Sequence, residues 1–167
     1  RELDDEKIEF YAIEGSHDFS PTDKTMMKVL ESAGLLTRVA KKDPNETEKL
    51  RLKFTVDEET GAKITGIVGR QRALEESYYK NLDRDFLEAE SGFKIFVFHS
   101  AISEYRPEIF KHMEGIPLSL LPKNFDYYAG GHVHSPDVFK EDDYGPIVFP
   151  GFTFPNDFRE LEIFEHG

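Results

Sequence analysis

The stretch Asp126-Tyr-Tyr-Ala-Gly-Gly-His132-Val-His134-Ser decides how this sequence is interpreted. An apolar run enters two glycines, and two histidines then follow at alternate positions. Side chains two residues apart in an extended segment point to the same face, so both imidazoles are expected to face one point while Val133 turns away. Neutral imidazole is a common ligand of transition metals, and a glycine just before it leaves room for a bound group. Taken alone, the pair fits a metal site and a polar strand end equally well.

Two more histidines follow apolar runs of the same kind. Residues 8–13 (IEFYAI) and 93–98 (FKIFVF) are typical of strands buried on both faces, and a third such strand is predicted at 125–129. The carboxyl ends of neighbouring strands meet at one edge of an open α/β sheet, and ligands collect there. Four histidines are therefore predicted to converge: His17, His99, His132 and His134. His112 and His166, in a predicted surface helix and at the chain end, are interpreted as solvated.

The remaining segments predict a single α/β domain. Ser20 begins a predicted helix that ends at Gly34, in which Met26, Val29, Leu30 and Ala33 keep helical spacing. The Met26–Met27 pair is expected to pack in the core. The other predicted elements are a hairpin, two helices and the short strands of a second, more antiparallel sheet: residues 50–56 with 63–68, residues 71–89 and 107–113, and residues 138–140, 147–149 and 161–164.

Length and composition limit the class of protein. The chain has 167 residues, 38% of them hydrophobic, which suits one globular domain. No apolar run approaches the ~18 residues of a membrane span, and no signal segment opens the chain. The absence of cysteine excludes disulfides and thiolate metal sites, so a metal would need His, carboxylate or amide ligands. A net charge of −12 argues against coating nucleic acid by charge alone, although metal ions could still hold a phosphodiester.

Three motifs resemble the last three motifs of the calcineurin-like metallophosphoesterases in order and separation. They are Gly15-Ser16-His17-Asp18, the strand that leads to His99, and Gly131-His132-Val133-His134. Residues 121–134, together with Pro146-Ile-Val-Phe-Pro-Gly151, are similar to the SbcD or Mre-eleven-type nucleases of DNA double-strand-break repair. The resemblance covers most of the chain and is weakest in residues 43–90. It implies a four-layer α/β/β/α metallophosphoesterase sandwich and a metal-dependent DNA exonuclease or endonuclease that hydrolyses phosphodiester bonds.

The resemblance also implies roles for individual residues. Two divalent metal ions, Mn²⁺ in this group, would be held between the histidines. The positions that match metal ligands are Ser16, His99, His132 and His134. Ser16 stands where the family has an Asn. His17 would be the catalytic residue, contacting the scissile phosphate and assisting the leaving oxygen, with Asp18 orienting its imidazole.

The family's first motifs, an Asp-x-His and a Gly-Asp pair, have no counterpart before Ile8. We therefore expect residues 1–167 to be the carboxyl-terminal part of a single metallophosphoesterase domain, with the amino-terminal part missing. Such a fragment should be inactive and bind manganese poorly, because it offers neutral ligands only. An apolar edge should be exposed along residues 8–13.

The resemblance implies DNA and an SMC-like ATPase subunit of the Rad-fifty/SbcC type as partners, and a homodimer of the full-length protein. It implies no membrane and a cytoplasmic, DNA-associated location. Two alternatives remain open. Another member of the superfamily, acting on nucleotides or phosphomonoesters, suits the acidic charge, and a catalytically weak scaffold suits the change from Asn to Ser at position 16. The YYAGGH corner and the PIVFPG segment favour the nuclease.

Overall fold

The computed structural model of the chain describes a mixed α/β fold, which confirms the predicted class. The described residues are 6, 8–18, 25–45, 48–69, 74–106, 114–155 and 158–163, without the side chains of 74, 75, 159 and 163. The predicted helix start at Ser20 and the predicted helix at 107–113 lie outside these residues. Within the part described, no helix is long and apolar enough to cross a membrane.

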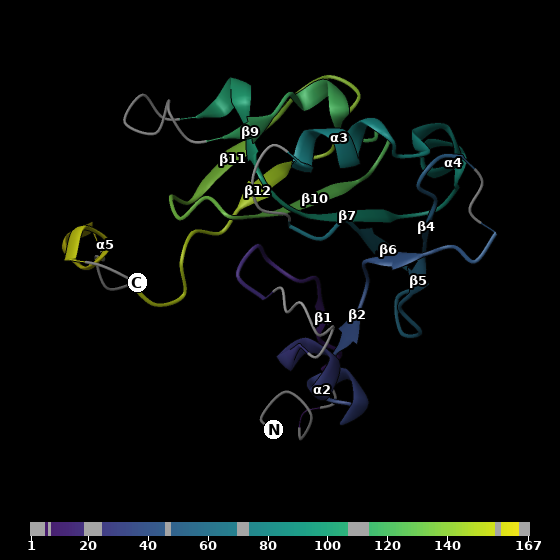
Figure 1. Cartoon of the computed structure of the whole chain (residues 1–167), viewed down its shortest axis with the longest axis horizontal. Helices are drawn as coiled ribbons and strands as arrows, with labels where there is room; N and C mark the ends of the chain where they lie inside the picture. The colour runs from purple at the N-terminus through teal and green to yellow at the C-terminus, as the bar shows by residue number, and fades with distance from the viewer. Residues whose placement is uncertain are drawn as a thin grey trace.

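A six-stranded mixed sheet organises the fold, in the order β11-β12-β10-β7-β6-β5 (Figure 1). The inner strands β6, β7, β10 and β12 run parallel, and the two edge strands are antiparallel to their neighbours. The predicted second sheet was wrong in part, because β11 and β12 join this same sheet. The six strands are β5 (Thr55–Val56), β6 (Lys63–Gly66), β7 (Lys94–His99), β10 (Tyr127–Gly131), β11 (Asp137–Phe139) and β12 (Ile147–Phe149).

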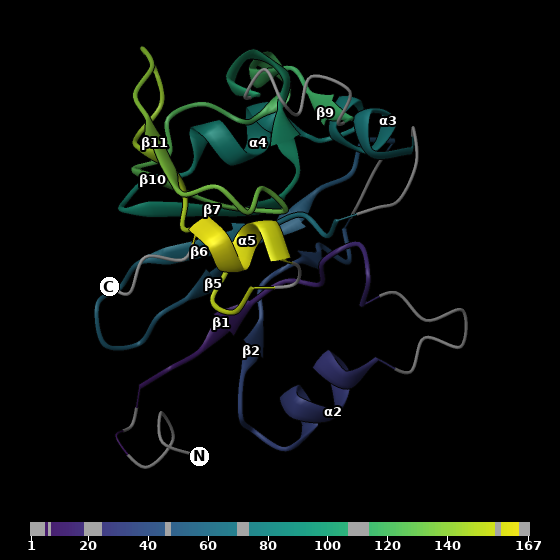
Figure 2. The same ribbon diagram turned by 90° about the vertical axis from the view of Figure 1, so that its left-hand side faces the viewer.

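The two central strands, β7 and β10, each bury one face more deeply than the other. In β7 Phe96 and Phe98 are buried, whereas Val97 and His99 are only partly buried. Helices α3 (Leu74–Lys80) and α4 (Arg84–Ala89) lie on one side of the sheet (Figure 2). Asp83 caps α4 by accepting from Phe86 N–H, which divides the single predicted helix into two. The expected burial on both faces was therefore wrong, since the sheet packs fully on one side.

The hydrophobic core lies between the sheet and these helices. Its centre is aromatic: the rings of Phe96 and Phe125 meet edge-on with centroids 5.4 Å apart, and Tyr128 donates a hydrogen bond of 2.6 Å to Pro122 O. The fully buried members come from strands, helices and loops alike: Leu50, Ile67, Tyr79, Leu87, Phe96, Phe98, Ile102, Ile116, Leu121, Tyr128 and Ile147.

On the other side of the sheet lie β1 (Tyr11–Ala12), paired in parallel with β2 (Thr37–Arg38), and then helix α2 (Met26–Ser32). Figure 2 shows the layers in the order α3 and α4, large sheet, β1 and β2, α2, which agrees with the predicted α/β/β/α order. Ile8 and Phe10 are 56% and 47% exposed, so the expected burial of this strand was wrong.

Helix α2 begins after Thr25, whose side chain accepts a hydrogen bond from Lys28 N–H, and Gly34 at φ 72° follows its end as predicted. Its apolar side does not enter the core. Met26 is 70% exposed, so its predicted core packing was wrong, and Val29 is 60% exposed beside it on the helix. The spacing identified the helix correctly, but within the described residues no element covers this face.

The remaining elements are short. Strands β3 (Lys41–Lys42) and β4 (Leu52–Lys53) form one pair, and β8 (Ala101–Ile102) and β9 (Gly115–Ile116) form another. Among the residues described, Ser103–Tyr105 and Leu118–Leu120 form 3₁₀ turns. The predicted strand at 161–164 was wrong, because Phe158–Ile163 forms helix α5. In Figure 1 α5 stands away from the sheet, at the end of an extended segment.

Candidate functional site

The ends of β7 and β10 bring His99 and His132 together, as predicted. The two strands are parallel neighbours whose register pairs Gly131 with His99, so His132 is the first residue beyond this pair. The imidazole centroids lie 5.2 Å apart, with the ring planes at 61°. Both histidines are partly buried. Two strands separated along the chain thus deliver two ring nitrogens to one edge of the sheet.

The backbone turns sharply at His132. Strand β10 ends at Gly131, and His132 has φ 78°, in the left-handed region that favours glycine. The extended alternation expected across His132 and His134 is therefore wrong as a description of the backbone. Val133 packs against the core. A non-glycine residue held at this φ costs about 1–3 kcal/mol, and such conformations cluster at functional sites.

The four histidines share one electrostatic environment. Burial, together with charge on His132, His17 and His134, lowers the pKa of His99 to about 4, although Asp18 opposes the shift. Burial also lowers the pKa of His132, assisted by His134 and His17. Of the four, only His99 and His132 are brought together by a ring contact, and the convergence of all four side chains stays a prediction. At neutral pH His99 carries no charge and offers a nitrogen lone pair.

Three glycines from three segments surround the His99 ring. A Cβ added to Gly131 would lie 2.8 Å from Nδ1, and one added to Gly15 would lie 3.0 Å from Cε1. A Cβ added to Gly69 would lie 2.8 Å from Cδ2. Each backbone approaches the imidazole more closely than a side chain would allow. Gly69 was not predicted as part of the site, and its only sequence signal is its place after the strand that ends at Gly66.

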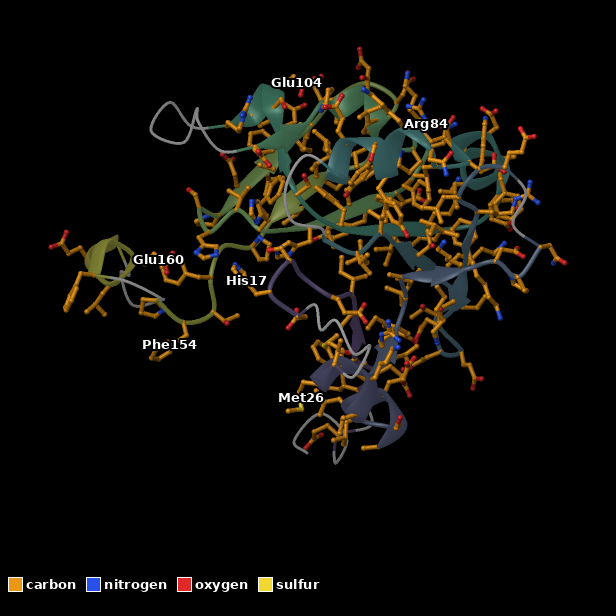
Figure 3. All side chains as sticks on the ribbon, viewed as in Figure 1. His17, Met26, Arg84, Glu104, Phe154 and Glu160 are labelled. Atoms are coloured by element: carbon orange, nitrogen blue, oxygen red, sulfur yellow. The ribbon has the colours of Figure 1, made fainter. Side chains whose placement is uncertain are left out.

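The loop that carries His17 is held by its own backbone. Asp18 Oδ2 accepts a hydrogen bond of 2.9 Å from Gly15 N–H, and Asp18 N–H donates to Gly15 O at 3.2 Å. The structure therefore gives Asp18 a role in fixing the turn, in place of the expected contact with the imidazole of His17. Ser16 is 9% exposed and His17 is exposed. Figure 3 shows His17 projecting from this loop.

An ion pair between a buried carboxylate and a partly buried guanidinium holds the same loop. Glu14 is 4% exposed and pairs with Arg38 of β2, while Glu14 O accepts a hydrogen bond of 2.9 Å from Gly69 N–H. The second carboxylate oxygen, Oε2, has no hydrogen-bond partner among the residues that the structure describes. Arg38 also contacts Glu31 at 3.4 Å. Sequence reasoning missed this pair, because the partner of Glu14 lies on a different strand.

His134 has an acidic partner from the C-terminal helix. Its Nδ1 is hydrogen-bonded to Glu160 Oε1 of α5, and the ring of Phe152 lies 6.5 Å away. Glu160 was also missed, because residues 161–164 were predicted as a strand and not as part of a helix. Figure 3 shows Glu160 beside the α5 ribbon, on the side turned toward the rest of the molecule.

No protein-family model matches the sequence. Among curated proteins, the DNA double-strand break repair protein Mre11 of Archaeoglobus fulgidus is 28% identical over 159 residues, covering 93% of this chain and 35% of that protein. The chain resembles Mre11. The protein of the same name from Methanopyrus kandleri is 24% identical over an alignment of 173 positions, covering 96% of this chain and 35% of the relative. The chain thus spans about a third of the length of these relatives.

These relatives confirm the resemblance inferred from the motifs, and they lead to the question of whether the site fits a metal. The candidate ligands are imidazoles and the Ser16 hydroxyl, which suit a transition metal in type. Across the described ranges, however, no three His, Asp or Glu side chains are grouped closely enough to hold an ion. Nearby carboxylates are committed elsewhere: Asp18 to backbone and Glu160 to His134. The described residues do not complete a metal site, so the ligand roles remain predictions.

Proposed function

We propose that this chain carries part of the active site of a metal-dependent DNA nuclease, an exonuclease or endonuclease that hydrolyses phosphodiester bonds in double-strand-break repair. One observation carries the proposal: His99 and His132 meet at 5.2 Å on adjacent parallel strands of a chain similar to Mre11 proteins over 93% of its length. Open α/β sheets bind ligands at the edge where the ends of neighbouring parallel strands meet, which is where these two histidines lie.

In this proposal His99, His132 and His134 hold two divalent metal ions, Mn²⁺ in the first place, and Ser16 adds its hydroxyl. The ions would supply positive charge at the phosphate, which a chain of net charge −12 needs from another source. The lowered pKa of His99 and His132 supports the role, since only a neutral imidazole can ligate. The carboxylate ligands would come from outside the described residues.

His17 is proposed as the catalytic residue. Its side chain is exposed and can contact a substrate. Asp18 and the Glu14–Arg38 pair, and not His17 itself, make the contacts that hold the loop. A histidine at this position could contact a non-bridging phosphate oxygen and give a proton to the leaving oxygen. The contacts that hold the loop support such a role, because a proton donor must be kept within hydrogen-bond reach.

DNA is the proposed substrate, and an SMC-like ATPase of the Rad-fifty/SbcC type and a second copy of the protein are the proposed partners. The support is the name of the relatives, which are DNA double-strand break repair proteins. A cytoplasmic, DNA-associated location goes with this proposal. Because the acidic chain cannot attract DNA by charge alone, we expect affinity for DNA to depend on metal and on the partner.

A second candidate is a phosphoesterase that acts on nucleotides or phosphomonoesters, which the net charge of −12 favours. A scaffold without turnover is a third candidate, suggested by Ser16. The test measures hydrolysis by the full-length protein with Mn²⁺, using labelled duplex DNA, single-stranded DNA, a simple phosphodiester and a nucleotide as substrates. We expect DNA to be cleaved. Turnover of the nucleotide alone would select the second candidate, and no turnover with any substrate would select the scaffold.

A further inference from the structure

We propose that Glu160 is a positioning residue for His134: its carboxylate accepts the Nδ1–H of the imidazole and so leaves Nε2 as the nitrogen with the lone pair. This inference deepens the proposed function, since it rests on His134 acting as a ligand. It concerns a residue on a helix that the motifs do not include. The contact joins Nδ1 of His134 to Oε1 of Glu160 across 26 positions of sequence.

Nothing in the sheet fixes the His134 ring by itself. Strand β10 ends at Gly131, the chain turns at His132, and the side chain of His134 is 48% exposed. Its carboxylate partner is better protected, because the Glu160 side chain is only 16% exposed. An ion pair between two exposed side chains would be weak. A carboxylate shielded from solvent makes a stronger and better oriented hydrogen bond to its partner.

The segment that leads to α5 is itself fitted against His134. Gly151 has φ 79°, and a Cβ added there would lie 3.0 Å from His134 O and 3.1 Å from Pro136 Cδ. Only glycine allows both this φ and this approach without strain. Phe152, the next residue, places its ring 6.5 Å from the imidazole, with the planes at 64°. Gly151 and Phe152 thus lie against the backbone and the ring of His134, and Glu160 follows on α5.

This arrangement has a chemical consequence. A neutral imidazole carries one N–H and one lone pair, and the partner of one nitrogen decides which nitrogen keeps the proton. Histidines that ligate a metal usually donate their second ring N–H to a carboxylate or carbonyl, which orients the ring. Glu160 has the position and chemistry of such a partner. Through Glu160, helix α5 would therefore influence whether His134 can bind a metal ion.

The test is the tautomer of His134, read from imidazole ¹⁵N resonances of the natural-length polypeptide at pH ~8.5, above the usual range of imidazole titration. The wild type should show only the Nδ1–H tautomer. Glu160→Ala should give a mixture of both tautomers, and Glu160→Gln, whose amide oxygen can still accept, should restore Nδ1–H. Glu162→Gln on the same helix, where Glu162 is exposed, is the matched control and should change nothing.

Unchanged His99 and His132 resonances in Glu160→Ala would verify that the variant is folded. If these resonances collapse, Glu160→Gln provides the comparison instead. An Nε2–H tautomer in the wild type, or the same tautomer in Glu160→Ala as in the wild type, would overturn the proposal. A second readout is Mn²⁺ affinity, expected to fall ~10–100-fold in Glu160→Ala and to recover in Glu160→Gln. Absence of Mn²⁺ binding by the wild type would refute the proposed function, while the tautomer would still decide the role of Glu160.

Discussion

Gly131 pairs with His99 across β10 and β7, and a Cβ on Gly131 would lie 2.8 Å from the Nδ1 atom of that imidazole. The ring is thus held against bare backbone at the strand end. A methyl group at this position has no room, because Gly15 and Gly69 confine the same ring from other directions. The position of His99 depends on three glycines, so substituting one of them should displace the His99 ring while the overall fold is kept.

The first prediction concerns Gly131→Ala. The added methyl should push the His99 ring from its position and destabilise the protein by about 1–3 kcal/mol, the usual cost of overpacking. The measurement is the chemical shift of the His99 ring together with urea unfolding. Gly61→Ala is the control: a Cβ there meets nothing within 4 Å, although φ 73° adds backbone strain. Gly61→Ala should lose stability without moving the His99 resonances, and equal shifts in both variants would contradict the prediction.

The second prediction concerns pH. The pKa of His99 is lowered to about 4, below the unfolded value of about 6.5. The unfolded state therefore binds more protons between these values, so the contribution of His99 is complete above pH ~6.5 and is lost progressively as pH falls toward 4. Urea unfolding at several pH values should show this loss in the wild type and a smaller one in His99→Gln. An NMR titration of His99 with a midpoint near 6.5 would contradict the structure.

The third prediction separates the proposed proton donor from the proposed ligands. In the natural-length polypeptide, His17→Ala should keep its Mn²⁺ content and lose ~10²–10⁴-fold in DNA cleavage, because a positioned acid contributes that much. His132→Ala should lose both metal and cleavage. Metal analysis of the two purified variants beside a cleavage assay makes the comparison. Equal loss of metal in both would mean that His17 is a ligand.

The fourth prediction concerns the buried ion pair behind the His17 loop. Arg38→Met leaves the buried Glu14 carboxylate without its partner, which should cost about 3–5 kcal/mol. Glu14→Gln should cost less, because Arg38 is partly exposed and keeps its contact with Glu31. The double variant should recover much of that loss. Glu76→Gln, which breaks the exposed Glu76–Lys80 pair, is the control and should change the free energy of unfolding by at most about 1 kcal/mol. Additive losses in the double variant would mean that the two side chains act independently.

Strands whose apolar pattern is long were the easiest part of the fold to predict. β7 and β10 follow their sequence patterns to within about two residues. The strand predicted at 8–13 shrinks to Tyr11–Ala12, since an apolar run shows that a segment could be buried and not what is available to cover it. Met26 and Val29 of α2 illustrate the same limit, because helical spacing identifies a face but not its partner.

The sequence predicted the histidines of the candidate site but not the residues that hold them in place. His99 and His132 could be placed together because parallel strand ends share an edge. The turn at His132 could not be foreseen, since the sequence favours continued extension there. Arg38, Gly69 and Glu160 were missed because their contacts join distant segments, and α5 was predicted as a strand from a short apolar alternation. Short apolar segments are ambiguous between helix and strand.

The measurement that tests the central claim most directly is Mn²⁺-induced broadening of histidine ring resonances in the natural-length polypeptide. The account predicts that substoichiometric Mn²⁺ broadens His99, His132 and His134 first, while His112 and His166 stay sharp. Broadening that begins at His112 or His166 and leaves the His99–His132 pair sharp would contradict the account.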